Sequence, residues 1–210
     1  MPTEKQMTKV TLQDAVADLY KRAWVDKATT STARLDVLAS LCVQELNARG
    51  LTDARIDPQI PGFARAKDWD VAWLHHGKAR LAISLKSILK NLPGTVPNRI
   101  DDLIGEVANL QMHSPETAIG YVMLFNVAED ENSKKHNCTW GELFRRRLRS
   151  ISGRKAPHWT VGTIEAAAFI EVDFSSGPNL VSGAEELPQM FDTLVGLVKE
   201  RNPDLAQTQS

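Results

Sequence analysis

The sequence is short of several features that would place a protein outside the ordinary globular class. It has only two cysteines, Cys42 and Cys138, too few for a disulfide framework or a zinc site, so a reducing cytoplasm is expected. No apolar run approaches the roughly 20 residues needed to cross a bilayer. The N-terminus, MPTEKQMTKV, lacks the apolar core of an export signal. The formal net charge is -1, so any contact with nucleic acid must come from local clusters of Lys and Arg.

The composition matches that of ordinary soluble proteins. The 210 residues are 42% hydrophobic and 24% charged, which suits one compact domain with a proper core. Neither an internal repeat nor a long linker divides the chain, so residues 1–210 are expected to form a single domain. Its expected parts are N-terminal helices in 1–50, a central region in 67–127, and helices with a strand in 140–203.

Apolar residues at helical spacing predict five helices. They cover residues 9–27, 32–49, 98–113, 140–150 and 185–201. We expect Thr29, Thr30 or Ser31 to cap the second helix and Gly50 to end it. The stretch 89–98 is expected to be a loop because it contains two prolines and a glycine.

Other apolar runs predict strands. Residues 70–74 and 80–88 alternate on either side of a two-histidine turn and are expected to form a β-hairpin. Residues 118–127 are almost wholly apolar, as in a strand buried on both sides, and a strand is expected from about residue 167. Residues 52–67 predict a loop with room for one short strand. This order of elements indicates an α/β fold, a mixed central β-sheet flanked by helices.

The hairpin carries an unusual set of polar side chains. Asp70 heads a strand that should otherwise be buried, where an unpaired carboxylate would be costly. Ser84 and Lys86 are two residues apart on the second strand, so both point to one face, and Leu85 points to the other, expected to be the core. Oxygen ligands hold Mg²⁺, and a metal with a lysine beside it can support hydrolysis of a phosphodiester.

Acidic side chains on neighbouring helices are further candidate metal ligands. Asp102 and Glu106 lie on the polar face of helix 98–113, at a spacing of four residues. Taken singly, each is more often part of a solvated helix face. Glu45, in helix 32–49, lies beside an apolar stripe. It is either a boundary residue whose carboxylate reaches water, which we favour, or a carboxylate directed into a site.

Asp70, followed after a hairpin by Ser84-Leu85-Lys86, resembles the PD-(D/E)XK motif of a nuclease superfamily that includes many type II restriction endonucleases. The resemblance covers about residues 68–125 and implies a mixed sheet flanked by helices, with Mg²⁺-dependent cleavage of double-stranded DNA. Two positions depart from the motif, because Trp69 replaces proline and Ser84 replaces an acid.

The resemblance also implies a role for each residue. Some restriction endonucleases carry a Ser-x-Lys version of the motif, with the acid moved to the following helix. Here that acid would be Glu106, with Asp102 and Glu45 as alternatives. Asp70, Glu106 and the Leu85 backbone carbonyl would then bind Mg²⁺. Ser84 would assist through its hydroxyl or a water, and Lys86 would position the nucleophile.

Several side chains are candidates for contact with DNA, because guanidinium and ammonium groups bind phosphate. They are Lys90, Asn91, Arg99, Arg145, Arg146 and Arg149. Cutting both strands of a palindrome is easiest for a two-fold dimer, so a homodimer is expected. The alternatives are a nuclease-like module that binds DNA or protein without cutting, and an unrelated α/β protein whose charges are ordinary surface residues.

Overall fold

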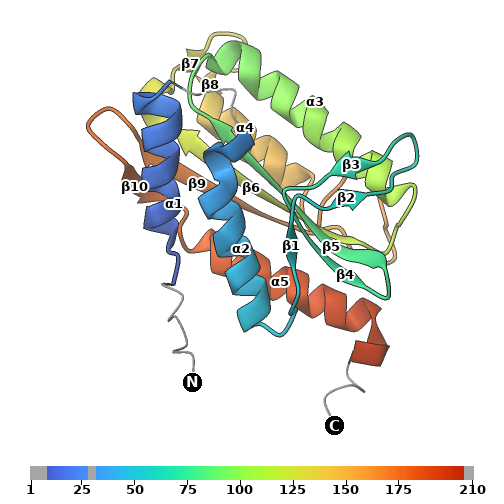
Figure 1. The fold of residues 1–210 in the computed structure, drawn as a ribbon. Helices are drawn as coiled ribbons and strands as arrows, with labels where there is room; N and C mark the ends of the chain where they lie inside the picture. The colour runs from blue at the N-terminus through green and yellow to red at the C-terminus, as the bar shows by residue number, and fades with distance from the viewer. Residues whose placement is uncertain (1–8, 28–31, 206–210) are drawn as a thin grey trace, which may run out of the picture.

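A six-stranded mixed sheet forms the centre of the computed structural model, which describes residues 9–27 and 32–205 (Figure 1). The strands are β1 (Arg55–Ile56), β4 (Val71–His75), β5 (Lys78–Ile88), β6 (Ala118–Asn126), β9 (Ala166–Asp173) and β10 (Asn179–Ser182), and they lie side by side in that order. β5, β6 and β9 are parallel to one another, whereas β1, β4 and β10 are antiparallel to their neighbours. The expected mixed sheet is therefore confirmed, including the β4–β5 hairpin.

Helices cover both faces of the sheet, as predicted (Figure 1). One face packs against α1 (Leu12–Leu19), α2 (Asp36–Ala48) and α5 (Glu186–Arg201), and the other packs against α3 (Leu92–Gln111) and α4 (Trp140–Ser150). A π-helical segment, Tyr20–Val25, continues α1, and a 3-10 turn, Thr32–Leu35, leads into α2. Within the described ranges, no helix is both long enough and apolar enough to span a membrane.

The start of α3 corrects the sequence prediction. Residues 89–98 were expected to form a loop, but the helix begins at Leu92 and includes Pro93 and Pro97. Pro93 is tolerated because the first-turn N–H groups of a helix have no intrahelical partner. Pro97 lies deeper and removes one backbone hydrogen bond, yet Leu92 and Val96 are both buried, so packing against the sheet outweighs this local loss.

The second helix and the short strands show the limits of local patterns. Gly50 follows α2 with φ 91°, as a helix-ending glycine should, whereas its predicted caps in 29–31 lie outside the described residues. Two small antiparallel sheets of two strands each are also present. One, the β2–β3 ribbon, pairs β2 (Gln59–Ile60) with β3 (Lys67–Asp68), and the other pairs β7 (Asn132–Ser133) with β8 (Cys138–Thr139). Strands of two residues are too short to show alternation. The sequence therefore predicted room for only one short strand in 52–67, whereas β1, β2 and β3 all begin there.

Strand β5 is buried on both faces rather than one. Leu85 packs with α1, α2 and α5, as predicted. Its neighbours Ala82 and Ile88 belong to the second core, under α3 and α4. The face that carries Ser84 and Lys86 is therefore also covered, and any site on it must lie at the end of the sheet.

Candidate active site

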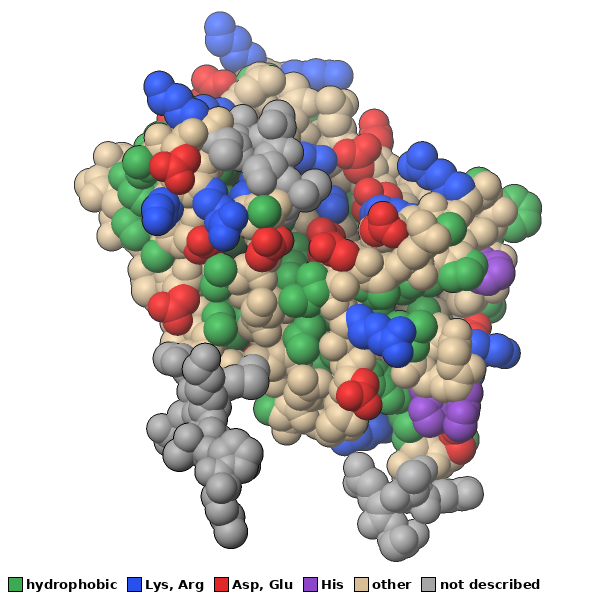
Figure 2. Space-filling view, in the orientation of Figure 1, with side chains coloured by type: hydrophobic (Ala, Val, Ile, Leu, Met, Phe, Trp, Pro, Cys, Tyr) green, Lys and Arg blue, Asp and Glu red, His purple; other side chains and the backbone are tan. Residues whose placement is uncertain are grey.

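A polar cavity of about 620 Å³ lies where β4 begins and β5 approaches its end. Its charged lining consists of Asp36, Asp57, Asp68, Asp70 and Glu106, together with Arg34, Lys86 and Arg99. These residues come from α2 on one face of the sheet, from α3 on the other, and from the strands between them. Figure 2 shows a band of acidic side chains on this side of the molecule, with Lys and Arg side chains beside it.

Asp70 and Lys86 meet in this cavity. Asp70 lies one residue before β4, and the antiparallel pairing of Val71 with Ile83 brings it opposite β5. The Leu85 N–H donates a 2.8 Å hydrogen bond to Asp70 Oδ2, and Lys86 Nζ lies 3.4 Å from the same oxygen. The two side chains are 32% and 19% exposed, so the pair is only partly screened by solvent. The hairpin thus holds an acid and a lysine together at the cavity wall.

Glu106 is the predicted helix acid that reaches the cavity. It lies on α3 and forms an ion pair with Lys67 of β3, whose ammonium also lies 4.9 Å from the centre of the Trp69 ring. Burial lowers the pKa of Lys67, and the charge of Glu106 opposes that shift. Lys86 lowers the same pKa and Asp70 raises it. The charges of Glu106, Lys86 and Asp70 therefore all act on Lys67.

The two alternative acids point elsewhere. Asp102 pairs with Arg99 at 3.2 Å, and its side chain is half exposed. Glu45 pairs with Arg49 on the same helix, α2. Neither side chain lines the cavity. Of the three acids considered, Glu106 alone is placed beside Asp70 and Lys86.

Ser84 does not contribute to the cavity surface. It is 1% exposed, and its hydroxyl has no hydrogen-bond partner among the described residues. The same is true of the hydroxyl of Tyr121, which is opposite Ser84 in β6, and burial raises the pKa of Tyr121. A direct contact between Ser84 and a ligand in the cavity would therefore require the site to rearrange.

The lining has an excess of negative charge. The pKa of Asp57 is raised, first by burial and then by the charges of Asp70, Asp36 and Asp68. A divalent cation would offset this repulsion, and carboxylate oxygens are the ligands that Mg²⁺ prefers. The donor set of Asp70 and Glu106 therefore fits Mg²⁺, an ion that commonly takes one or two carboxylates and keeps several waters.

Two arginines provide positive charge on the same cavity wall. Burial lowers the pKa of Arg34, and the nearby charge of Arg99 lowers it further. Holding the two positive charges of Arg34 and Arg99 close together costs free energy. An anion bound between them would reduce this repulsion. Arg99 was a predicted DNA contact. Arg34 was missed although it lies in the predicted helix 32–49, because the pattern of that helix does not show that its start reaches the cavity. Lys67 was missed because it lies in 52–67, which was predicted as a loop.

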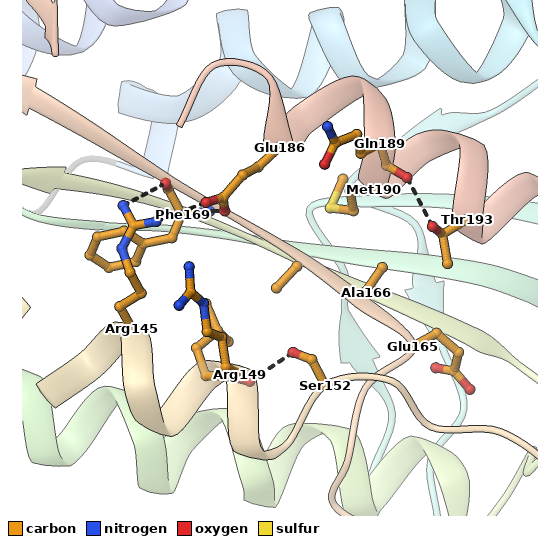
Figure 3. Close-up of a pocket in the computed structure, with 12 residues that line it drawn as sticks. Arg145, Arg149, Ser152, Glu165, Ala166, Phe169, Glu186, Gln189, Met190 and Thr193 are labelled. Atoms are coloured by element: carbon orange, nitrogen blue, oxygen red, sulfur yellow. Dashed lines mark hydrogen bonds and ion pairs between the residues drawn. The ribbon is translucent and has the colours of Figure 1, made fainter. Parts of the chain in front are cut away.

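The predicted DNA contacts separate into two regions. Asn91 and Arg99 line a groove of about 470 Å³ along the start of α3, and Lys90 lies over the Trp24 ring at 4.2 Å. By contrast, Arg145 and Arg149 line a cavity of about 380 Å³ between α4 and α5 (Figure 3).

Arg145 and Arg146 of α4 make contacts within the protein. Arg145 pairs with Glu186 at 2.8 Å and packs over Phe169 (Figure 3). It also pairs with Glu171 at 3.4 Å. Arg146 approaches the Cys138 sulfur at 3.8 Å. None of the α4 arginines lines the cavity of Asp70. Their contact with DNA remains a prediction.

Comparison with known proteins adds a weak structural resemblance. No protein-family model matches the chain, and no curated protein matches it. Similar solved structures include the small subunit of the heterodimeric restriction endonuclease R.BspD6I. That similarity has a TM-score of 0.36 and 8% identity, and covers 95% of this chain and 100% of the subunit. At this TM-score it establishes neither a shared topology nor a shared activity.

Proposed function

We propose that the protein is a Mg²⁺-dependent endonuclease that hydrolyses phosphodiester bonds of double-stranded DNA at specific sites, like a type II restriction enzyme. The observation that supports this most directly is the meeting of Asp70, Lys86 and Glu106 in one polar cavity. Two carboxylates and a lysine beside a water-accessible space can hold a divalent metal ion and support metal-assisted hydrolysis.

Each side chain would have a distinct task. Asp70 and Glu106 would hold Mg²⁺, with the Leu85 carbonyl as a further ligand, and the bound ion would supply Lewis acidity and a more acidic water. Lys86, positioned by Asp70, would orient the attacking water and offset charge on the phosphate.

The arginines would act on the substrate rather than on the metal. Arg34 and Arg99 would receive phosphate oxygens, since guanidinium groups bind them bidentately. A homodimer would present two such cavities to the two strands of a palindromic site. The oligomeric state can be measured directly by analytical ultracentrifugation with and without a DNA duplex.

Cleavage of plasmid DNA with Mg²⁺ tests the proposal. Wild type should give discrete fragments, and Lys86→Ala or Glu106→Gln should slow cleavage by about 10²-fold or more, the usual contribution of a positioned acid–base group. Asp102→Asn is the matched control, because Asp102 lies on the same helix outside the cavity. Full activity of Lys86→Ala would overturn the proposal. Loss of activity in Asp102→Asn but not in Glu106→Gln would move the metal ligand to Asp102.

A second candidate function is binding of DNA without cleavage. It is favoured by the buried Ser84 hydroxyl at the position of the motif acid, and by Lys67, which neutralises Glu106. In that case wild type should retard a duplex in a native gel but leave it intact with Mg²⁺. Ser84→Glu would restore the missing carboxylate, and cleavage gained by that variant would support an inactivated nuclease site.

A further inference from the structure

A second group of potential metal ligands lies far from the cavity, at the tip of the β4–β5 hairpin. His75 ends β4, His76 follows in the turn, and Asp204 comes from the turn after α5. Within the described residues, these three are the group whose ligand atoms all lie within 4.8 Å of one another. Figure 2 shows histidine side chains beside an acidic one at the lower right, where Figure 1 places the hairpin tip and the end of α5.

The backbone of the turn brings the two imidazoles together. Adjacent residues of a regular strand point to opposite faces, but His76 has φ 49° and Gly77 has φ 74°, as in a type I′ hairpin turn. This conformation turns the His76 ring back alongside His75, with 4.0 Å between ring centres. Asparagine is the residue that usually occupies such a position. A histidine there adds a ligand without being needed for the turn.

The imidazole nitrogens already lie near the carboxylate at separations close to those in a coordination sphere, and the shorter of them is a hydrogen bond between His75 and Asp204. Asp204 Oδ2 lies 2.8 Å from His75 Nε2 and 3.6 Å from His76 Nε2. Ligand atoms about 2.0–2.2 Å from a tetrahedral Zn²⁺ are separated from one another by roughly 3.3–3.5 Å. The two observed distances bracket that value, so small side-chain rotations would be enough to form the site.

Neighbouring groups hold two of the ligands in place. The Trp73 ring stacks on His75, nearly parallel at 5.4 Å, and its indole N–H donates to the Thr52 carbonyl at 2.6 Å. The turn that carries Asp204 is closed by a 3.0 Å hydrogen bond from the Leu205 N–H to the Asn202 carbonyl, and Asn202 is buried. Supporting contacts of this kind orient metal ligands and strengthen binding.

We propose that His75, His76 and Asp204 bind a transition-metal ion, with Zn²⁺ as the best-fitting species, and that the ion joins the hairpin tip to the C-terminal end of α5. Two imidazoles and one carboxylate suit Zn²⁺, Ni²⁺ or Cu²⁺, whereas Mg²⁺ prefers oxygen ligands. The site is therefore chemically distinct from the cavity of Asp70. It does not depend on the protein being a nuclease.

Calorimetric titration of the full chain with ZnCl₂ tests the site, with excess Mg²⁺ present to occupy the oxygen-lined cavity. Wild type should bind one Zn²⁺, and His76→Asn and Asp204→Asn should each weaken binding by about tenfold or more. His76→Asn keeps a residue suited to the turn, so a folding defect is not expected. His158→Asn is the matched control, because His158 is an exposed histidine outside the group.

Thermal denaturation gives a second readout. Zn²⁺ at about 100 times its Kd should raise the Tm of wild type by roughly 5–10 °C, because it binds only the folded chain. That rise should fall to about half or less in His76→Asn, because tenfold weaker binding leaves about half of the stabilisation, and it should be kept in His158→Asn. Unchanged Zn²⁺ affinity in both His76→Asn and Asp204→Asn, or no Zn²⁺ binding by wild type, would overturn the proposal.

Discussion

Two lysines near the cavity are paired with different acids, and of these Lys86 lines the cavity whereas Lys67 does not. Lys86 lies 3.4 Å from Asp70, on the neighbouring strand of the same hairpin. Lys67 pairs with Glu106, which is 39 positions further along the chain on a helix, and it also packs over Trp69. The first pair follows from local strand pairing, whereas the second depends on how α3 packs against the β2–β3 ribbon. The electrostatic environment of each lysine therefore depends on a different contact.

The pKa of Lys67 should lie below the model-peptide value of 10.5, because burial disfavours its charged form. Glu106→Gln should lower that pKa further, since the Glu106 charge raises it. The measurement is an NMR titration of ¹³C-labelled lysine side chains. Asp102→Asn should leave the Lys67 resonance unaffected. A pKa equal to that of the unfolded chain would contradict the assignment.

The same shift predicts how stability depends on pH. With its folded pKa below its unfolded pKa, Lys67 takes up a proton on unfolding at pH values between the two. The free energy of unfolding contributed by Lys67 should therefore increase as pH rises from the folded pKa to about 10.5 and decrease as pH falls. Lys67→Met should remove this part of the slope in urea denaturation series recorded across that range.

At the scale of elements, α3 carries a proline beyond its first turn. Pro97 cannot donate the backbone hydrogen bond to the carbonyl of Pro93, and it is exposed. Pro97→Ala should raise the free energy of unfolding by about 1 kcal/mol, because the gain of a helical hydrogen bond exceeds the loss of proline's restriction of the unfolded chain. Urea denaturation measures this change. A loss of stability would show that the proline is needed for the geometry of the helix start.

Glu165 connects several elements and was not singled out from the sequence. Its buried carboxylate pairs with Arg154 at 2.8 Å and Arg201 at 2.9 Å, and it accepts a 2.8 Å hydrogen bond from the Ile119 N–H. It thus links the loop before β9 to α5 and to the start of β6.

Glu165→Ala should destabilise the protein by about 3–5 kcal/mol, because it leaves two largely buried guanidinium groups without their shared partner. Chemical denaturation gives the value. Glu185→Ala is a suitable control, since Glu185 is exposed and precedes α5. Equal stability of the two variants would show that the buried network contributes no net stabilisation.

At the scale of the whole molecule, the cavity lies between layers rather than within one. α2 and α3 pack on opposite faces of the sheet, and both contribute to its lining. Five acidic side chains there face three basic ones, in a chain whose net charge is -1. Without a cation, such a surface should repel a phosphate backbone.

Affinity for a DNA duplex should therefore increase when a divalent cation is added, by about tenfold or more, because neutralising one or two carboxylates removes several like-charge contacts. Fluorescence anisotropy of a labelled duplex, with Mg²⁺ or with a chelator, measures this effect. The measurement uses the Lys86→Ala variant, in which we expect no cleavage under the proposed function. Tighter binding in the chelator would contradict the assigned role of the acidic lining.

Most of the elements, and the first half of the candidate site, follow from patterns in the amino-acid sequence. Helices and strands follow from periodicities within short windows, which explains why the mixed sheet, the five helices and the hairpin were all predicted. Asp70 and Lys86 were placed together because a hairpin pairs residues that are close in sequence. The proline-containing start of α3, the two-residue strands, strand β10 and the burial of β5 on both faces departed from these patterns.

The residues that lie beside Asp70 and Lys86 but are distant from them in sequence depend on the tertiary structure. The resemblance favoured Glu106, with Asp102 and Glu45 as alternatives, and the packing of α3 and α2 places Glu106 but neither alternative in the cavity. Lys67 enters the site through its ion pair with Glu106, and Asp204 meets His75 across 129 positions. Such contacts depend on the relative positions of whole helices and strands, which the side-chain pattern of one segment does not encode.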